Sequence, residues 1–421
     1  MTDVGSTARP ALPTEIWVLV VASFVIALGF GIVAPALPLF AQSFGVTAAA
    51  ASAIVSVFAG MRLVFAPLSG RLVQRRGERP VYLLGLLIVA LSTGACAFAQ
   101  GYWQLLVLRG LGGIGSTMFT VSAFGLVIRM SPEHSRGRVA GLYAASFLFG
   151  SVSGPLVGAA LVGLGLRAPF AIYAVTLVIA AAVVYVALRD SHLARPQPHL
   201  VPAATLRASL ARPAFRAVLW SNFANGWAVF GVRMALVPLF VVNALGQEAA
   251  VAGIVLTVFA VGNAVVLTAA GRLSDRYGRK PFLLFGSAIC GVGTIAMGFS
   301  DSLSWLVVSS LVAGFGSGLM TPVQQAAVAD LLGPAGRSGG ALAAFQMASD
   351  IGAVVGPVVA GALAQRWSYT AAFAVTGVVL LLATLYWSVV PETAPARAGS
   401  GDADPDQRPD PVGRRDRDPA Q

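Results

Sequence analysis

The chain has 421 residues, of which 57% are hydrophobic and 11% are charged. A soluble globular protein carries about 25% charged residues. This composition therefore excludes a soluble globular protein and indicates that lipid covers most of the surface. The formal net charge of +11 would suit nucleic acid binding in a soluble protein, but in an apolar chain basic residues gather beside the membrane. We therefore expect a membrane protein that binds no nucleic acid.

Apolar runs long enough to cross a bilayer, about 20 residues each, recur along the chain as far as Val390. We predict twelve of them, and hence an all-α membrane protein with twelve transmembrane helices. The predicted spans cover residues 16–39, 50–72, 80–99, 103–129, 138–163, 169–189, 215–243, 250–272, 281–300, 303–332, 338–364 and 368–390.

Basic residues are distributed unequally between the two membrane faces. Three of the 28 lie inside predicted spans, two (Arg167 and Arg366) lie on one face, and the others lie on the opposite face or in the tails. By the positive-inside rule, the basic face and both termini are cytoplasmic. Lys280 is the only lysine. Such a preference for arginine over lysine suggests a GC-rich bacterial genome, so we predict a multi-pass protein of the bacterial inner membrane.

The two halves of the sequence repeat each other at a separation near 200 residues. "GRLVQRRGERPVYL" from Gly70 matches "GRLSDRYGRKPFL" from Gly271, and "GSVSGPLVG" from Gly150 matches "GAVVGPVVAG" from Gly352. The repeat predicts two pseudo-symmetric six-helix bundles. We predict a cytoplasmic tail at 1–15, the first bundle at 16–189, a basic cytoplasmic linker at 190–214, the second bundle at 215–390 and a disordered cytoplasmic tail at 391–421.

Three motifs carry a resemblance to a known family: the loop from Gly271, "RGLGGIGSTMF" from Arg109 in span 4, and "GSVSGPLVG" in span 5. Over about residues 12–392 the chain resembles the major facilitator superfamily, and within it the twelve-span drug:proton antiporter group. The resemblance implies alternating access, in which two bundles rock around a site lined by spans 1, 4, 7 and 10.

The loop motif matches the family at a set of glycine and charged positions, namely Gly271, Asp275, Arg276, Gly278, Arg279 and Lys280. Glycines at both ends permit a tight turn, and Asp275 beside a helix N-terminus gains from the helix dipole. A topology anchor alone would explain the basic residues but not Asp275. The resemblance implies a cytoplasmic latch that holds the halves together when the transporter faces outward, with its target near Gly137–Gly141.

The predicted latch is asymmetric. Gln74 stands in the first half where the second has Asp275, and span 4 ends in Arg129 where span 10 ends in Asp330. Asp330 is therefore a candidate partner for Arg276 or Arg279. The family pattern has its acid in the first-half loop, and this chain departs from it.

A second motif in spans 5 and 11 predicts a helix hinge or a close seal. Small residues four apart let helix backbones approach each other, and a proline removes one helix hydrogen bond and permits a bend. Ordinary small-residue packing is the alternative interpretation. The residues are Gly150, Gly154, Pro155 and Gly158 in span 5 and Gly352, Gly356, Pro357 and Gly361 in span 11.

The predicted interior carries more positive than negative charge. Arg62, Arg109 and Arg233 accompany one clearly intramembrane carboxylate, Asp350, and the counterpart of Arg109 in the second half is taken as Ala313. Neutral polar residues, among them Gln324, Gln325 and Gln346, favour the second half. A rise of about 1.5 Å per residue places Arg62 and Asp350 at similar depths. We expect them to meet and to couple proton binding to the rocking of the halves, although a structural ion pair, or a bond from Asp350 to Gln346, is also consistent with the sequence.

These residues form the candidate proton-coupling or substrate cavity, and three functions remain open. The first is proton-coupled efflux of a small, partly apolar compound or drug, and the second is transport of an organic anion through an Arg-rich cavity. The third is a membrane receptor or scaffold that does not transport. The sequence offers no nucleophile or metal-ligand set, so we expect no enzyme activity, cofactor or metal, and we expect a monomer.

Overall fold

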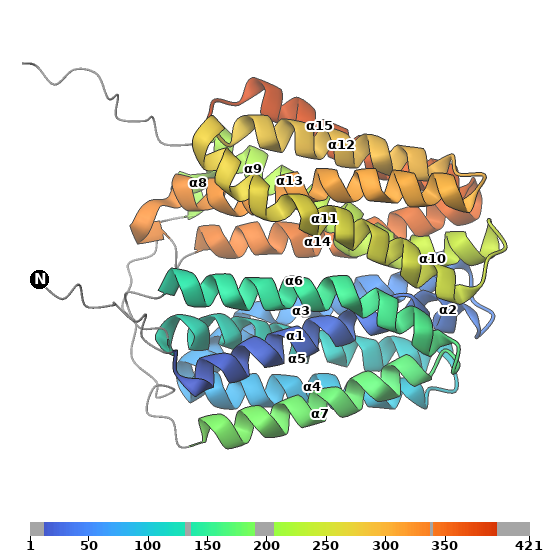
Figure 1. Ribbon diagram of the computed structural model, residues 1–421, viewed down its shortest axis with the longest axis horizontal. Coiled ribbons are helices and arrows are strands. Elements are labelled where there is room, and N and C mark those ends of the chain that lie inside the picture. The colour runs from blue at the N-terminus through green and yellow to red at the C-terminus, as the bar shows by residue number, and fades with distance from the viewer. Residues whose placement is uncertain (1–11, 131–135, 190–205, 337–339, 394–421) are drawn as a thin grey trace, which may run out of the picture.

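The computed structural model describes residues 12–130, 136–189, 206–336 and 340–393, and within them it contains helices and no β-strand (Figure 1). The helices are α1 (Thr14–Val33), α2 (Ala36–Gln42), α3 (Ala48–Arg76), α4 (Glu78–Ala97), α5 (Tyr102–Met130), α6 (Arg136–Val162), α7 (Ala168–Leu188), α8 (Leu206–Leu210), α9 (Pro213–Asn225), the π-helix η3 (Gly226–Val232), α10 (Arg233–Asn243), α11 (Ala249–Tyr277), α12 (Lys280–Gly298), α13 (Leu303–Gly336), α14 (Gly340–Arg366) and α15 (Tyr369–Val389).

Twelve segments of the described chain are long and apolar enough to cross a membrane, which confirms the predicted fold class. The first joins α1 and α2, and the seventh joins α9, η3 and α10. The break after α1 lies at Pro35. Proline has no N–H to donate to the preceding turn, which explains why the helix is interrupted there. Part of the predicted linker is helical, since it contains α8 and the start of α9. The disorder predicted for the C-terminal tail concerns residues that lie almost wholly outside the described ranges.

Each half has its own apolar core. One buried cluster is built almost entirely from α1–α7, and the other from α9–α15. In Figure 1 the first half lies below in blue and green and the second half above in yellow to red. The sequence repeat therefore corresponds to two bundles.

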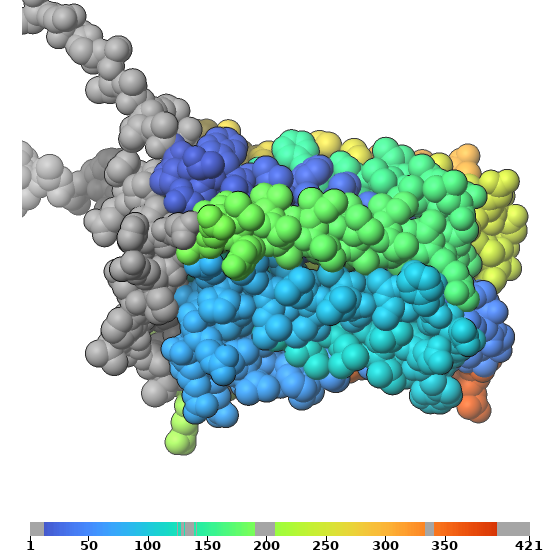
Figure 2. Space-filling view, turned by 90° about the horizontal axis from the view of Figure 1, so that it is seen from below, coloured from blue at the N-terminus to red at the C-terminus, as the bar shows by residue number. Residues whose placement is uncertain are grey.

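The outer face of the first bundle is apolar. Figure 2 shows this face, on which α7 lies beside α4 and α5. Leu91, Trp103 and Val186 on these helices are 71%, 74% and 63% exposed. Exposed apolar side chains of this size are typical of a surface that lipid covers.

The halves meet through small residues. We call the end of the bundles that holds Thr14 and Val389 the terminal end, and the other the far end. Near the far end, a Cβ on Gly253 of α11 would lie 2.7 Å from that of Ala159 on α6, and one on Gly361 of α14 would lie 2.9 Å from that of Ser52 on α3. Such distances leave no room for a side chain, so the backbones are in close contact.

A hydrogen bond also joins the halves at the far end. The amide Nδ2 of Asn243 donates to Oε1 of Gln42 at 3.1 Å. Both residues lie three positions before a glycine with positive φ, Gly45 or Gly246, so the bond joins equivalent positions of the repeat. The two amides therefore meet across the pseudo-twofold axis.

Toward the terminal end the exposure of α3 increases. No residue between positions 51 and 60 is exposed, whereas Val64 and Leu68 are 68% and 54% exposed. Figure 1 agrees, because α11 crosses toward α6 only at the far end. The structure is thus closed at the far end.

Gly253→Leu tests this closure. The added side chain has no space beside Pro155 and Ala159, and overpacking of about 1–3 kcal/mol should favour a state with an open far end. Spin labels on cysteines introduced at Gln100 and Asp301, in far-end turns of the two halves, should move apart in pulsed electron resonance measurements. Gly70→Leu is the control, because a Cβ at Gly70 meets nothing within 4 Å. An unchanged distance distribution in Gly253→Leu would contradict the packing argument.

Candidate functional site

In the described part of the interior, one ion pair crosses between the halves. Nε of Arg62, on α3, lies 3.6 Å from Oδ1 of Asp350, on α14, and the two side chains are 30% and 22% exposed. Nη1 of Arg62 also donates to Oγ of Ser116, on α5, at 3.2 Å. Arg62 therefore contacts its own bundle and the opposite one at the same time, and the described polar contact of Asp350 is with Arg62 and not with Gln346.

The repeat places a neutral version of this arrangement in the second half. The counterparts of Arg62 and Ser116, 201 residues later, are Asn263 and Ser317, and Nδ2 of Asn263 donates to Oγ of Ser317 at 2.9 Å. Counted from Gly150 and Gly352, the counterpart of Asp350 is Leu148. Among the described residues of the two symmetric interfaces, that of α3 with α14 carries an interior ion pair and that of α6 with α11 does not.

Arg109 lies inside the first bundle and not at the interface. Its side chain is 5% exposed, and its guanidinium carbon lies 4.1 Å from the centroid of Phe58 and 5.9 Å from that of Phe30. Two aromatic faces thus offset part of its charge.

The residue of the second half that corresponds to Arg109 is not Ala313, as the sequence analysis had it. The backbone contacts of Gly113 with Phe58 and of Gly314 with Phe259 fix a separation of 201, which pairs Arg109 with Ser310 and not with Ala313.

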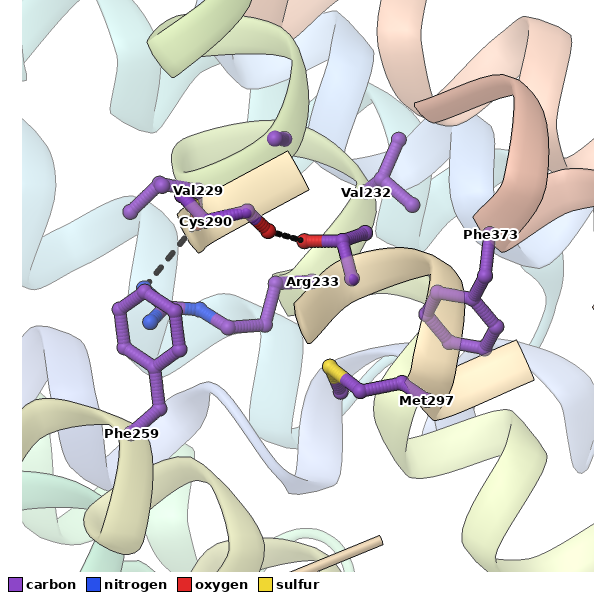
Figure 3. A pocket seen from close by; sticks show the side chains of 9 residues that line it. Val229, Val232, Arg233, Phe259, Cys290, Met297 and Phe373 are labelled. Atoms are coloured by element: carbon purple, nitrogen blue, oxygen red, sulfur yellow. Dashed lines mark hydrogen bonds between the residues drawn. The ribbon is translucent and has the colours of Figure 1, made fainter. Parts of the chain in front are cut away.

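Arg233 lies inside the second bundle. Its guanidinium carbon is 3.4 Å from the centroid of Phe259, the counterpart of Phe58, and its Nη2 donates to the carbonyl of Val229 at 3.1 Å (Figure 3). The sequence suggested that the three interior arginines share one cavity, but the structure does not bring them together. Arg62 lies at the interface, and the other two contact rings of separate bundles.

The predicted glutamines lie in different surroundings. Gln324 is 1% exposed, and its Nε2 has no hydrogen-bond partner, whereas Gln325 and Gln346 are exposed. Nearby, Nδ2 of Asn222 on α9 donates to the carbonyl of Phe345 on α14 at 2.6 Å. The three glutamines are thus not brought together as one polar cluster.

Among the described residues, no three His, Cys, Asp or Glu side chains gather in a way that could hold a metal ion. Cys96 and Cys290 are free and buried. The described interior therefore offers charge and hydrogen bonding for a site, from arginine, asparagine, glutamine and one aspartate.

The charged loop of the second half is organised around Arg279. Its Nε bonds Oδ2 of Asp330 at 3.0 Å, its Nη1 donates to Oγ of Ser274 at 2.8 Å, and it also pairs with Asp275. Burial alone would lower the pKa of Arg279, but the hydrogen bonds and negative charges of Asp330 and Asp275 outweigh burial and raise it. Asp330 thus pairs with Arg279, while Arg276 lies over the ring of Tyr277.

Glu392, which the sequence analysis missed, holds the N-terminus of α12. Its carboxylate accepts the backbone N–H of Arg279 at 2.8 Å and of Lys280 at 3.0 Å. Nζ of Lys280 donates to the carbonyl of Ser388, near the end of α15, at 2.9 Å. A carboxylate at this position gains from the helix dipole. This role was predicted for Asp275, which instead pairs with a side chain and is 66% exposed.

Only one of the two loop glycines makes the turn. Gly278 has φ +94 and ends α11, whereas Gly271 lies within that helix. The described contacts of the loop join helices of the second half to one another, so in this conformation they include no latch to the first half. The expected target near Gly137–Gly141 borders residues 131–135, which lie outside the described ranges.

The repeat reverses the signs of the charged pair. Glu78 stands 201 residues before Arg279, and Arg129 stands 201 residues before Asp330. The side chain of Arg129 lies outside the described part of the structure, while Glu78 contacts Gly125 of α5, the helix that ends near Arg129. The two halves thus carry opposite charges at equivalent positions.

The glycine motif packs helices closely. A Cβ on Gly154 would lie 2.5 Å from the carbonyl oxygen of Leu28 on α1, and one on Gly356 would lie 2.8 Å from that of Trp227 in η3. Gly150 and Gly158 contact α1 in the same way, and Gly352 contacts the carbonyl of Phe223. Both α6 and α14 continue through Pro155 and Pro357 without a break. Gly361 differs, because it packs on α3 of the other half.

Two bundles of six membrane-spanning helices, related by a sequence repeat and in contact through small residues and the pair of Arg62 and Asp350, are the architecture of a membrane transporter. The sequence model of the Major Facilitator Superfamily matches residues 19–232 and 218–415, and the chain belongs to this family.

Named relatives and solved structures agree with the family. "Multidrug resistance protein MdtG" of Salmonella paratyphi C (strain RKS4594) is 28% identical over 379 residues, which are 87% of this chain and 92% of the relative. The protein of that name from Salmonella typhi is 27% identical over 379 residues, with the same coverage. A bacterial homolog of the human lysosomal transporter Spinster, in an inward-facing and unoccupied conformation, has a TM-score of 0.75 at 17% identity and covers 90% of this chain and 97% of that chain. A POT family transporter in complex with 5-aminolevulinic acid has a TM-score of 0.73 at 14% identity and covers 89% and 95%.

Arg279→Met should lower the stability of the second bundle by about 3 kcal/mol, because it leaves the partly buried Asp330 without its cation. Thermal unfolding in detergent measures the loss, and Asp330→Leu in the same chain should restore part of it. Because the pKa of Arg279 is raised, its charge and its contribution persist at every pH below the usual arginine value, so the difference from wild type should stay constant as the pH rises from neutral to moderately alkaline. Arg276→Met, a change in an exposed neighbour, is the control and should cost less than about 0.5 kcal/mol. Equal losses in the two variants would contradict the central role of Arg279.

Proposed function

We propose that the chain exports small, partly apolar compounds in exchange for protons by alternating access. The observation that carries the proposal is the pair of Arg62 and Asp350, which lies between the two halves rather than within one. Among the described residues, Asp350 is the one carboxylate in the middle of a membrane-spanning helix. The relatives named as multidrug resistance proteins support the direction and the class of solute.

The pair offers a physical route to coupling. An adjacent arginine favours the ionised form of a carboxylate, and a carboxylate left alone in low-dielectric surroundings is protonated. When the halves rock, α3 and α14 move relative to each other, so the partner of Asp350 changes with the direction in which the transporter opens. Proton binding and rocking would then be linked reciprocally.

We place the terminal end in the cytoplasm, because most basic residues lie there. In that orientation the far end faces outward, and the closed far end corresponds to an inward-facing state. The loop around Arg279 would act as a latch only in the opposite state, when the terminal ends approach each other. The proline and glycine positions of α6 and α14 would let these helices flex during the change.

Transport of an organic anion is the second candidate, and the geometry gives it less support. Of the three interior arginines, Arg62 alone lies where the halves meet, and it is paired with Asp350. Arg109 and Arg233 contact aromatic rings within separate bundles. Flux of a cationic dye such as ethidium, compared with that of an anionic dye of similar size, separates the two candidates.

Asp350→Asn tests the coupling in proteoliposomes, with a solute first identified by compound tolerance of an overexpressing strain. Flux driven by a pH gradient should fall about 5- to 150-fold, which matches the usual coupling free energy of about 1–3 kcal/mol, while solute exchange without a gradient should persist.

Leu148→Asn is the matched control, because it places the same amide at the equivalent position of the other interface, and it should keep gradient-driven flux. Undiminished gradient-driven flux in Asp350→Asn would contradict the proposal, as would an equal loss in the control.

A further inference from the structure

The helices α3 and α14 are in contact near the far end and separate toward the terminal end. Ser52 is buried against Gly361, and farther along α3 a Cβ on Gly60 would lie 3.7 Å from a methyl group of Val354. A Cβ on Gly70, ten residues beyond Gly60, would meet nothing within 4 Å. The helices therefore enclose a gap that widens toward the terminal end, which we call the α3–α14 wedge.

The walls of the wedge are apolar. On α14, Met347 and Ala343 lie three and seven positions before Asp350, so they share the helix face that meets α3. On α3, Val64 and Pro67 lie four and seven positions after the last close contact with α14. All four of these apolar side chains are exposed. The wedge therefore offers two apolar surfaces that the protein itself leaves uncovered.

Two arginines stand at the mouth of the wedge. Arg71 and Arg75 are one turn of α3 apart and exposed, and among the described contacts neither has a hydrogen bond or an ion pair. Gln74 lies between them, and the acid nearest in sequence, Glu78, packs on Gly125 of α5. The described mouth thus carries positive charge without an acid to balance it.

The equivalent position of the second half differs in one charge. The two arginines recur 201 residues later, on α11, as Arg272 and Arg276, with Asp275 between them where α3 has Gln74. An acid beside two arginines weakens their attraction for an anion. The difference between Gln74 and Asp275 therefore makes the mouth on α3 the better site for a negative group.

The wedge is about as deep as one leaflet of a bilayer. Arg62, at its narrow end, and Arg71, at its mouth, are nine residues apart, which is about 14 Å along a helix that rises about 1.5 Å per residue. The hydrocarbon core of a bilayer is about 30 Å thick, so one leaflet contributes about 15 Å. A lipid with its headgroup at Arg71 would therefore bring the end of its acyl chain close to Arg62.

We propose that the α3–α14 wedge binds an anionic phospholipid of the leaflet at the terminal end. One acyl chain lies along Val64 and Met347, and the phosphate accepts hydrogen bonds from Arg71 and Arg75. The chain keeps α3 and α14 apart at the terminal end, so the lipid favours the conformation described here and leaves when the gap closes. The site is independent of what the protein transports.

Quenching of a fluorophore by spin-labelled lipid tests the site in proteoliposomes. Bimane attached to Met347→Cys reports on the wedge, because the native cysteines Cys96 and Cys290 are buried. Phosphatidylglycerol with a nitroxide on one acyl chain should quench it more strongly than phosphatidylcholine with the same chains at equal mole fraction. Bimane attached to Leu87→Cys, at an exposed position of α4, is the control and should be quenched equally by both lipids.

Changes at the mouth of the wedge should remove the preference for phosphatidylglycerol. Arg71→Gln should weaken its binding about fivefold, because one basic residue near anionic lipid contributes about 1 kcal/mol. Gln74→Asp should weaken it by a similar factor, since it places an acid between the two arginines. Arg272→Gln, the same change at the equivalent position of α11, should leave the quenching in the wedge unchanged.

Equal quenching by the two lipids in the wedge would overturn the proposal, as would an equal loss in Arg71→Gln and Arg272→Gln. Displacement of phosphatidylglycerol by an excess of inorganic phosphate would also overturn it, because the mouth would then be a site for a free anion. None of these outcomes bears on proton-coupled export, because no flux is measured.

Discussion

The structure depends on the close approach of helix backbones at glycine. In each half a row of glycines on the fifth membrane span lies against carbonyl groups of the first span, so the two backbones are in direct contact. At the far end Gly253 and Gly361 bring the halves equally close. In a bilayer, where apolar burial gives helices little reason to associate, such van der Waals contact carries much of the stability. The interior charges can therefore serve other purposes than holding the bundles together.

The repeat accounts for the two similar bundles, and different residues at equivalent positions account for their different charges. Arg62 and Asn263 each bond a serine of the fourth helix of their half, yet only Arg62 faces an acid. Glu78 of the first half stands where the second half has Arg279, and Arg129 stands where it has Asp330. A transporter with identical halves would have two equal interfaces, whereas in the described part of this chain one interface carries an ion pair and the equivalent positions of the other are neutral.

The sequence was sufficient for the twelve helices, the two bundles and the meeting of Arg62 with Asp350, because apolar length, repeat and helical rise determine them. It was not sufficient for the surroundings of Arg109 and Arg233, since an arginine in a span can face a cavity or an aromatic ring and periodicity does not distinguish these. Glu392 lies 112 residues from Lys280, whose N–H it accepts, and no local pattern signals such a contact.

The amide pair of Gln42 and Asn243 has an energetic consequence. A partly exposed hydrogen bond of this kind contributes about 0.5–1.5 kcal/mol, which corresponds to roughly a tenfold change in a two-state population at most. Because each amide meets its own repeat counterpart, this bond joins the far ends of the two bundles, in addition to the close contacts at Gly253 and Gly361. Such a bond biases the equilibrium between the two open states without fixing it, so a solute that binds one open state about tenfold more tightly than the other offsets the bias.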